Sequence, residues 1–247
     1  MQNKKIAIYT SLFGNYDNFK ENDEYSSLYD YYIITDLEEL KTKVYKKIIV
    51  KPLFSNSQKN SRFYKINGHE EFKNYDYLIY HDSNFMLKTD AIEYLVKYAF
   101  NNDMACSSHS IRSNVYDELL ACLTLNKEKR LKIIKYSFRL YKENIKIEDG
   151  LFETPIMVIN VKNYFNKQIN QFWWHEINKH TIRDQLSLPL IKHKYNIKIG
   201  TILGNVFKND YSINWPHNIQ NFKLRNDIIT KVVYKFILII KNKSKKK

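Results

Sequence analysis

The sequence predicts an α/β fold in which a mostly parallel sheet is flanked by helices. Short apolar segments of strand length alternate along the chain with segments whose apolar residues recur at helical spacing. Parallel strands need helical crossovers that cover both faces of the sheet, so this alternation favours a parallel arrangement. With 247 residues, of which 44% are hydrophobic, the chain is long enough for one large domain and too apolar for a disordered one.

The first part of the chain is expected to form strands that enclose one helix. The strands are expected where apolar residues dominate, at Ile6–Thr10, Tyr31–Thr35, Ile48–Val50 and Tyr77–Tyr80. The first is followed by the loop SLFGNYD, and the second ends at Asp36. Between the third and the fourth, SQKNSRFYKINGHEEF has a helical period, with Gly68 near its end.

The rest of the pattern continues the alternation. Asp90 and Glu93 have the spacing of a capping box, which predicts a helix from Asp90 to about Phe100. Further helices are expected within Val115–Tyr141, with an interruption near Asn126, and at Phe172–Lys179 and Asp184–Lys192. Further strands are expected at Met104–Ser107, Pro155–Asn160 and Lys198–Leu203.

Polar clusters follow several of these strands. They are the loop after Thr10, the acid Asp36, and the segment Asp82–Asn84 after the strand in YDYLIYHDSNFML. One acid after a strand is usually a turn or N-cap residue. Several such ends in one sheet favour a shared crevice, because ligands of open α/β sheets bind at the carboxyl ends of the strands.

Asp82 and Asn84 carry two oxygen donors at a strand end. Such donors suit a hard divalent ion, Mg²⁺ or Mn²⁺, which keeps waters and takes phosphate oxygens as further ligands. A diphosphate would then be held by metal rather than by a glycine-rich loop, since the chain has only five glycines and no P-loop motif. An Asx-turn would require the same residue types.

The chain also resembles the glycosyltransferase-like family typified by the plant TOD and MUCI proteins, which has many bacterial members. The resemblance lies in an ordered set of segments over about residues 6–190, namely YTSLFGNYD, IITD, SRFYKINGH, YLIYHDSNF, SSHSIRSNVYDE, GLFETPIMVIN and TIRDQLSLPL. It implies a GT-A fold, with a Rossmann-like nucleotide half joined to an acceptor half, and a nucleotide-sugar donor. The strand-end motif of GT-A enzymes is usually D-x-D, and its third position here is Asn84, a neutral and weaker ligand.

Together, the residues and the resemblance predict a donor side. The residues expected around the nucleotide and its diphosphate are Thr10, Gly14, Tyr16, Asp17, Asp36, Arg62 and Lys65. Arg62 and Lys65 lie three apart on a predicted helix, so they share a face and are placed to neutralise a diphosphate. The alternatives are an ordinary turn at FGNYD and a solvated basic face on the helix.

Later clusters predict the acceptor side and the catalytic groups. Expected acceptor residues are His109, Arg112, Glu118 and Gln185; expected catalytic residues are Asp184, Glu153 and Arg183; His217 is a candidate third metal ligand. Asp184 begins a predicted helix, where the helix dipole also favours an acid. In the functional interpretation a carboxylate lies near the reacting sugar, where an inverting enzyme needs a general base.

The formal charge of +14 is concentrated at the C-terminal end. Lys223–Lys247 holds nine basic residues against one acid, a net +8, which leaves +6 for residues 1–222. Only six of the 40 basic residues are arginine, and strand-end acids would repel phosphates without a metal. We therefore expect no nucleic-acid partner.

The chain is expected to divide into a transferase domain at 1–222 and a basic amphipathic tail at 223–247. Apolar residues from Ile228 to Ile240 recur on one helical face. With the lysines, this stripe predicts a helix lying on an anionic membrane surface, while a final helix packed on the body would show the same stripe. No signal-peptide core or apolar run of about 18 residues is present, and two cysteines make no disulfide framework. A cytoplasmic protein attached peripherally to the inner face of the membrane is expected.

Two functions remain open from the sequence. The first is a hexosyltransferase-like enzyme of bacterial polysaccharide synthesis, which moves a sugar from a nucleotide-sugar donor to a surface-glycan or lipid-linked acceptor with a divalent cation. The alternative is a non-catalytic nucleotide-, glycan- or nucleic-acid-binding module derived from a transferase fold. The presence of both Asp82 and Asp184 favours the enzyme, because a degenerate transferase would be expected to lose one of them.

Overall fold

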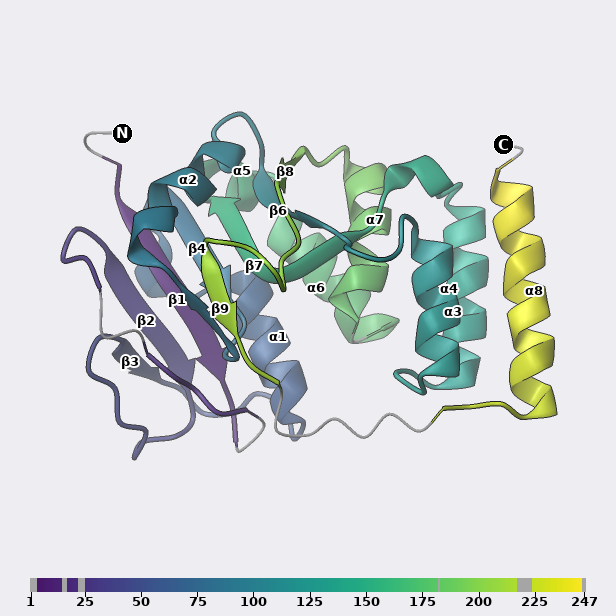
Figure 1. The fold of residues 1–247 in the computed structure, drawn as a ribbon, viewed down its shortest axis with the longest axis horizontal. Helices are drawn as coiled ribbons and strands as arrows, with labels where there is room; N and C mark the ends of the chain where they lie inside the picture. Colours follow the sequence, from purple (N-terminus) through teal and green to yellow (C-terminus); the bar gives the residue numbers. More distant parts are fainter. Residues whose placement is uncertain (1–3, 15–16, 22–24, 182, 217–223, 246–247) are drawn as a thin grey trace.

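The computed structural model describes residues 4–14, 17–21, 25–181, 183–216 and 224–245 (Figure 1). Its centre is a seven-stranded sheet with the order β3-β2-β1-β4-β7-β6-β8. The strands are β1 Ile6–Leu12, β2 Asp30–Thr35, β3 Lys46–Ile49, β4 Tyr77–His81, β6 Met104–Ser108, β7 Phe152–Asn160 and β8 Ile199–Ile202. Within this sheet only β7 is antiparallel to its neighbours. The predicted α/β class with a mostly parallel sheet is confirmed.

Helices cover both faces of this sheet. The helices in the described part of the chain are α1 Ser57–Asn67, α2 Ile92–Val96, α3 Val115–Thr124, α4 Arg130–Lys142, α5 Val161–Asn166, α6 Ile169–Lys179, α7 Asp184–Tyr195 and α8 Ile228–Ser244. Alternate residues of β1 enter different cores: Ala7 and Tyr9 pack with α1, α6 and α7, while Ile6 and Ile8 pack on the side of α2. This two-sided burial explains why the strands read as continuous apolar runs.

Helix α1 begins and ends where the sequence indicates. The side chain of Asn56 accepts a hydrogen bond of 2.8 Å from the backbone N–H of Lys59, which caps the first turn. Gly68 follows the last turn with φ +64°, a conformation that favours glycine. The helix runs close to β1, where the hydroxyl of Tyr9 donates to the backbone carbonyl of Lys65 at 2.8 Å.

Other local predictions were wrong or incomplete. The capping box at Asp90 does not form: Lys88 precedes a 3₁₀ turn at Thr89–Ala91 with no side-chain cap, and the helical stretch to Ala99 is built of short pieces around α2. A small second sheet pairs β5 Phe85–Leu87 with β9 Ser212–Asn214 and was not predicted. Strands of three residues are too short to show a period.

The C-terminal helix α8 packs on the body of the protein at one end of the molecule, beside α3 and α4 (Figure 1). Val233, Ile237 and Ile240 are buried in the same core cluster as those helices. The alternative from the sequence, a final helix packed on the body, is therefore correct for Val233, Ile237 and Ile240. The proposed boundary at 222/223 falls within 217–223, outside the described residues.

Across the described part of the chain, no helix is both long enough and apolar enough to cross a bilayer.

Candidate functional site

A cavity of about 730 Å³ lies at the carboxyl edge of the central sheet. Its wall includes Ser11 near the end of β1, Asp82 just beyond β4, Glu153 near the start of β7 and Asp184 at the start of α7. Strand β7 is antiparallel, so its first residues reach the same edge as the last residues of its neighbours. The topology thus gathers residues from four distant segments around one space.

A cluster of charged side chains lies at the inner wall of this cavity: Arg62, Asp82 and Asp184 line it, and the buried Lys65 lies behind them. The Lys65 ammonium lies 2.8 Å from Oδ2 of Asp184 and 3.2 Å from Oδ1 of Asp82. Nη1 of Arg62, one turn earlier on α1, lies 3.5 Å and 3.8 Å from the same two oxygens. The hydroxyl of Thr154 donates to Oδ2 of Asp184 at 2.7 Å. Two cations and two carboxylates therefore meet at the sheet edge, and the predicted shared face of Arg62 and Lys65 is confirmed.

These cations determine the charge state of Asp184. Burial by itself would raise the pKa of this carboxyl group, but Arg62 and Lys65 together hold the pKa well below its ordinary value. Its Oδ1 also accepts a hydrogen bond from the backbone N–H of Gln185 at 3.1 Å, at the start of α7 where the helix dipole favours an anion. Asp184 is therefore ionised across the physiological range and has little affinity for a proton.

Asp82 and Asn84 lie in a tight turn directly after β4. The turn is closed by a 2.9 Å hydrogen bond from the backbone N–H of Phe85 to the carbonyl of Asp82. The hydroxyl of Tyr80 donates to Oδ1 of Asp82 at 3.0 Å, and the amide of Asn84 donates to the carbonyl of Trp215 at 2.8 Å. Among the described residues, the buried Oδ1 of Asn84 has no hydrogen-bond partner, so it is a candidate ligand atom for a cation.

The donors at this turn fit a divalent cation with few protein ligands. Among the described residues there is no group of three or more His, Cys, Asp or Glu side chains that would form a protein-only metal site. The oxygen of Asn84 and the carboxylate of Asp82 are hard donors, and an ion held by two of them would complete its shell with water and phosphate. His217, the third ligand proposed from the sequence, lies outside the described residues.

Glu153 is a second carboxylate in the cavity wall, in a different environment. Its Oε1 accepts a 2.9 Å hydrogen bond from the hydroxyl of Ser110, while its buried Oε2 has no partner within the residues that the structure describes. Burial raises the pKa of Glu153, and the hydrogen bonds from Ser110 and the charge of Arg112 oppose this effect only in part. The pKa of Glu153 is thus raised while that of Asp184 is lowered, a separation typical of acid–base assignments.

His109 and Arg112 also face the cavity, and Glu118 supports them from behind. Burial, helped by the charge of Arg112, lowers the pKa of His109 to about 4, so its ring is neutral at pH 7. Nε of Arg112 donates to Oε2 of Glu118 at 2.6 Å. Glu118 is fully buried and lies outside the lining of the cavity, so it holds Arg112 rather than a ligand.

Arg183 and Gln185 complete the wall beside Asp184. Nη2 of Arg183 donates to Oε1 of Gln185 at 3.4 Å, and Nε of Arg183 is buried with no partner in the described part of the chain. Unpaired buried groups on Asn84, Glu153 and Arg183 thus offer two acceptors and one donor around the same space. Such groups normally find a partner, and a bound ligand would supply it.

The first loop contributes less to the wall than the sequence indicated. Of its predicted residues, Asp17 lines the cavity and accepts a 3.0 Å hydrogen bond from the hydroxyl of Ser83. Thr10 and Gly14 do not line it, and Asp36 accepts a 2.9 Å hydrogen bond from the backbone N–H of Gly14. Asp36 therefore fixes the loop in this structure. Tyr16 lies outside the described residues.

Sequence reasoning did not place Tyr80 and Thr154 in the charged cluster. It offered Trp173, Trp174 and Trp215 alike as rings for stacking on a sugar, with core packing as the commoner use of tryptophan. Trp215 reaches the cavity because β9 pairs with β5 next to Asn84, and its indole N–H donates to the carbonyl of Asn18 at 2.9 Å. The Lys20 ammonium lies 5.2 Å from its ring. Tyr80 and Thr154 could have been proposed from the sequence because each lies within two residues of a predicted site acid, Asp82 and Glu153 respectively.

His81, directly before Asp82, makes the stability of the fold depend on pH. Burial lowers its pKa from the ordinary 6.5 to about 4, and its Nε2 lies 2.8 Å from the hydroxyl of Tyr45. The unfolded chain binds the proton more tightly, so stability is full above pH 6.5 and is lost as the pH falls toward 4. We expect His81 to account for about 2 kcal/mol of the loss between pH 7 and pH 5.

Urea unfolding of the wild type and of His81→Asn at pH 7 and pH 5 measures how much of the stability loss is due to His81. The variant is expected to be less stable at pH 7 but to lose less on acidification, because His109 and His180, whose pKa values burial also lowers, keep their contributions. Equal losses in the two proteins would show that His81 is not the titrating group.

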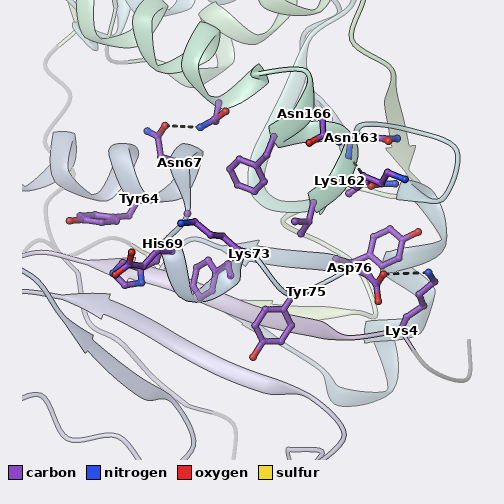
Figure 2. A pocket seen from close by; sticks show the side chains of 18 of the residues that line it. Lys4, Tyr64, Asn67, His69, Lys73, Tyr75, Asp76, Lys162, Asn163 and Asn166 are labelled. Carbon is purple, nitrogen blue, oxygen red and sulfur yellow. Dashed lines mark hydrogen bonds and ion pairs between the residues drawn. The ribbon is translucent and has the colours of Figure 1, made fainter.

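A larger cavity, of about 960 Å³, lies at the opposite edge of the sheet (Figure 2). Two pairs of its polar side chains contact each other: the Lys4 ammonium lies 3.4 Å from Asp76, and the amide of Asn170 donates to Asn67 at 3.2 Å. Within the described residues, the buried side-chain atoms that lack a partner all lie elsewhere. The smaller cavity is therefore the candidate functional site.

Comparisons with known proteins identify the family of the chain. Residues 1–215 match the family described as TOD1/MUCI70, glycosyltransferase-like domain. A solved structure that resembles the chain is the WbbM bifunctional glycosyltransferase in its apo form, with 14% sequence identity and a TM-score of 0.44. That likeness covers 81% of this chain but only 39% of the WbbM chain. No curated protein sequence matches the chain. Because the family match covers most of its length, the protein belongs to the TOD1/MUCI70 family of glycosyltransferase-like domains.

Proposed function

We propose that the protein is a GT-A-type glycosyltransferase that moves a sugar from a nucleotide-sugar donor to a hydroxyl group of a glycan or lipid-linked acceptor. The observation that carries the proposal is the cavity at the carboxyl edge of the sheet, where Arg62 and Lys65 meet Asp82 and Asp184 beside the raised-pKa Glu153. Membership of a glycosyltransferase-like family supports the same reaction class.

The donor would lie between α1 and the turn after β4. Arg62 lines the cavity where a diphosphate would sit, the buried Lys65 adds positive charge from behind it, and the ring of Trp215 offers a stacking surface for a base or a sugar. A divalent cation bound by Asp82 and Asn84 would supply further positive charge to the leaving diphosphate. Both sources of charge stabilise the leaving group as the sugar–phosphate bond breaks.

Glu153 is proposed as the general base. The acceptor oxygen forms a bond to the anomeric carbon, the bond from that carbon to the phosphate oxygen breaks, and the nucleoside diphosphate leaves with the electron pair. The proton of the acceptor hydroxyl passes to Glu153, whose unpaired Oε2 is able to receive it. Asp184, held ionised by two cations, keeps Lys65 and Arg62 in place.

The acceptor would approach from the side of His109, Arg112 and Gln185. These side chains line the cavity together with Asn126. A neutral imidazole, a guanidinium and two amides are suited to hydroxyl groups, because they combine donors with acceptors. The proposal thus places the donor and the acceptor on opposite sides of Glu153.

Calorimetric titration of UDP and GDP, in Mn²⁺ and in EDTA, tests the donor site, and release of diphosphate from a panel of nucleotide sugars tests turnover. We expect one nucleotide to bind, and Asp82→Ala to weaken that binding about tenfold or more in Mn²⁺, since a charge-assisted contact is worth about 1.5–3 kcal/mol. Asn84→Asp should tighten metal-dependent binding. Asp90→Ala, which removes an exposed acid, is the matched control.

The outcomes separate the parts of the proposal. Equal affinity of the wild type and Asp82→Ala, with and without Mn²⁺, would remove the metal bridge. Tight nucleotide binding with no turnover of any donor in the presence of glycan acceptors would favour the non-catalytic binding module instead.

A further inference from the structure

Helix α8 is apolar on two sides, and only one of them is used inside the protein. Val233, Ile237 and Ile240 are buried against the body. On the outward side, Ile228 is 80% exposed, and Val232, Ile229 and Ile239 are each more than half exposed. Apolar residues outside the stripe that faces the core indicate that the helix contacts a second apolar environment.

Helix α4 extends this outward surface. The two helices run side by side from Arg130, which pairs with Asp227, to Phe138, whose ring centroid lies 4.8 Å from that of Phe236. Phe138 is 45% exposed, and Leu131, two turns earlier on the same side of α4, is 62% exposed. We call this surface the α4–α8 face; it comprises Leu131, Phe138, Ile228, Ile229, Val232, Phe236 and Ile239.

The two helices of this face carry only positive charges, and Asp227, the acid directly before α8, is paired with Arg130. Helix α4 carries five basic residues and α8 carries four, and neither helix contains an acid. Lys132, Lys135, Lys231, Lys235 and Lys243 are exposed, so their long side chains rim the apolar residues. A second copy of the chain would bring like charges together on such a face, whereas an anionic surface is complementary to it.

The face also has a fixed relation to the candidate site. The backbone N–H of Arg225, just before α8, donates to the carbonyl of Thr124 at 2.8 Å, and its guanidinium donates to the carbonyl of Glu128 at 3.0 Å. Asn126 and Lys127, between those residues, line the 730 Å³ cavity. In Figure 1, α8 begins on the side of the molecule to which the arrow of β1 points.

We propose that the α4–α8 face docks on an anionic membrane surface, with apolar side chains entering the interface and lysines contacting acidic headgroups. The cytoplasmic leaflet carries such headgroups. Docking would hold the cavity near the membrane, where a lipid-linked acceptor resides; that part rests on the proposed transferase function, while the docking itself does not.

The test is sedimentation of the full chain with vesicles of phosphatidylcholine, with and without phosphatidylglycerol. We expect binding only to the anionic vesicles, and weaker binding at high salt because surface charges are screened. The variants Ile229→Ser/Val232→Ser and Lys231→Gln/Lys235→Gln should each lower the partition coefficient roughly tenfold or more. Leu28→Ser/Leu53→Ser and Lys41→Gln/Lys51→Gln, at exposed positions on other surfaces, are matched controls and should bind like the wild type.

Several results would overturn the proposal. The first is that the wild type does not bind anionic vesicles, and the second is that the face variants and the controls lose vesicle binding equally. The third is that the wild type is a dimer which Ile229→Ser/Val232→Ser makes monomeric, since the face would then join two copies. Circular dichroism checks that each variant is folded. Transfer to a soluble acceptor should be unchanged in the face variants, so failure of the docking and failure of the transferase proposal are told apart.

Discussion

Glu153→Gln is expected to lower the turnover of sugar transfer by about 10²–10⁴-fold, the usual contribution of a positioned general base. Glutamine preserves the shape of the side chain and its hydrogen bond with Ser110, but it cannot take a proton. Nucleotide binding and melting temperature should change little, because the substitution removes a buried group whose charge is already disfavoured by burial.

The pH profile of kcat/KM gives a second readout for Glu153. The base must be ionised, so activity should fall as the pH drops below its pKa, which lies above the ordinary value. In Glu153→Gln, the residual kcat/KM should no longer fall with this group as the pH is lowered. Activity within a few-fold of the wild type would remove Glu153 from the chemistry.

Glu176→Gln is a matched control for Glu153→Gln. Glu176 is also buried, but its carboxylate is paired with Arg139 at 2.7 Å and lies outside the lining of the cavity. The control should lose stability while keeping normal activity per folded molecule. If both variants lose activity only in proportion to their unfolding, the role of Glu153 is structural.

Lys65→Met is expected to lower the free energy of unfolding by about 3 kcal/mol or more. The side chain of Lys65 is 1% exposed and contacts both Asp82 and Asp184. Removing it takes the closest cation from the buried carboxylate of Asp184 and leaves the charges of Arg62 and Arg183, and a buried charge that has lost its closest partner is strongly destabilising. Urea unfolding at pH 7 measures the change, and nucleotide binding should weaken with it.

A double-mutant cycle separates the ion pair from the loss of packing. Asp184→Leu should cost less in the Lys65→Met background than in the wild type, because the unpaired carboxylate is then absent. Lys46→Met is the control: Lys46 pairs with Asp30 at 2.7 Å on the surface, where its side chain is 65% exposed, and should cost at most about 1 kcal/mol. Equal costs for Lys65→Met and Lys46→Met would contradict a buried charge cluster.

The local features of the fold follow from the sequence by itself. The side-chain period placed β1, β4 and α1 close to their observed bounds, because strand and helix periods depend on spacing within one segment. It also placed Arg62 and Lys65 on one face, since residues three apart on a helix are neighbours. The position of Asp82 at the end of a strand was also predicted from the local pattern.

The composition of the site was decided only by the tertiary structure. Lys65 contacts Asp184, which lies 119 residues later in the chain, and Asn84 contacts Trp215, which lies 131 residues later. The order of strands in the sheet creates both contacts. The sequence could not tell that Asp36 would bond to the first loop, that burial would raise the pKa of Glu153, or which side of α8 would be buried. These properties depend on which distant groups exclude water from a side chain, and a local pattern carries no information about those groups.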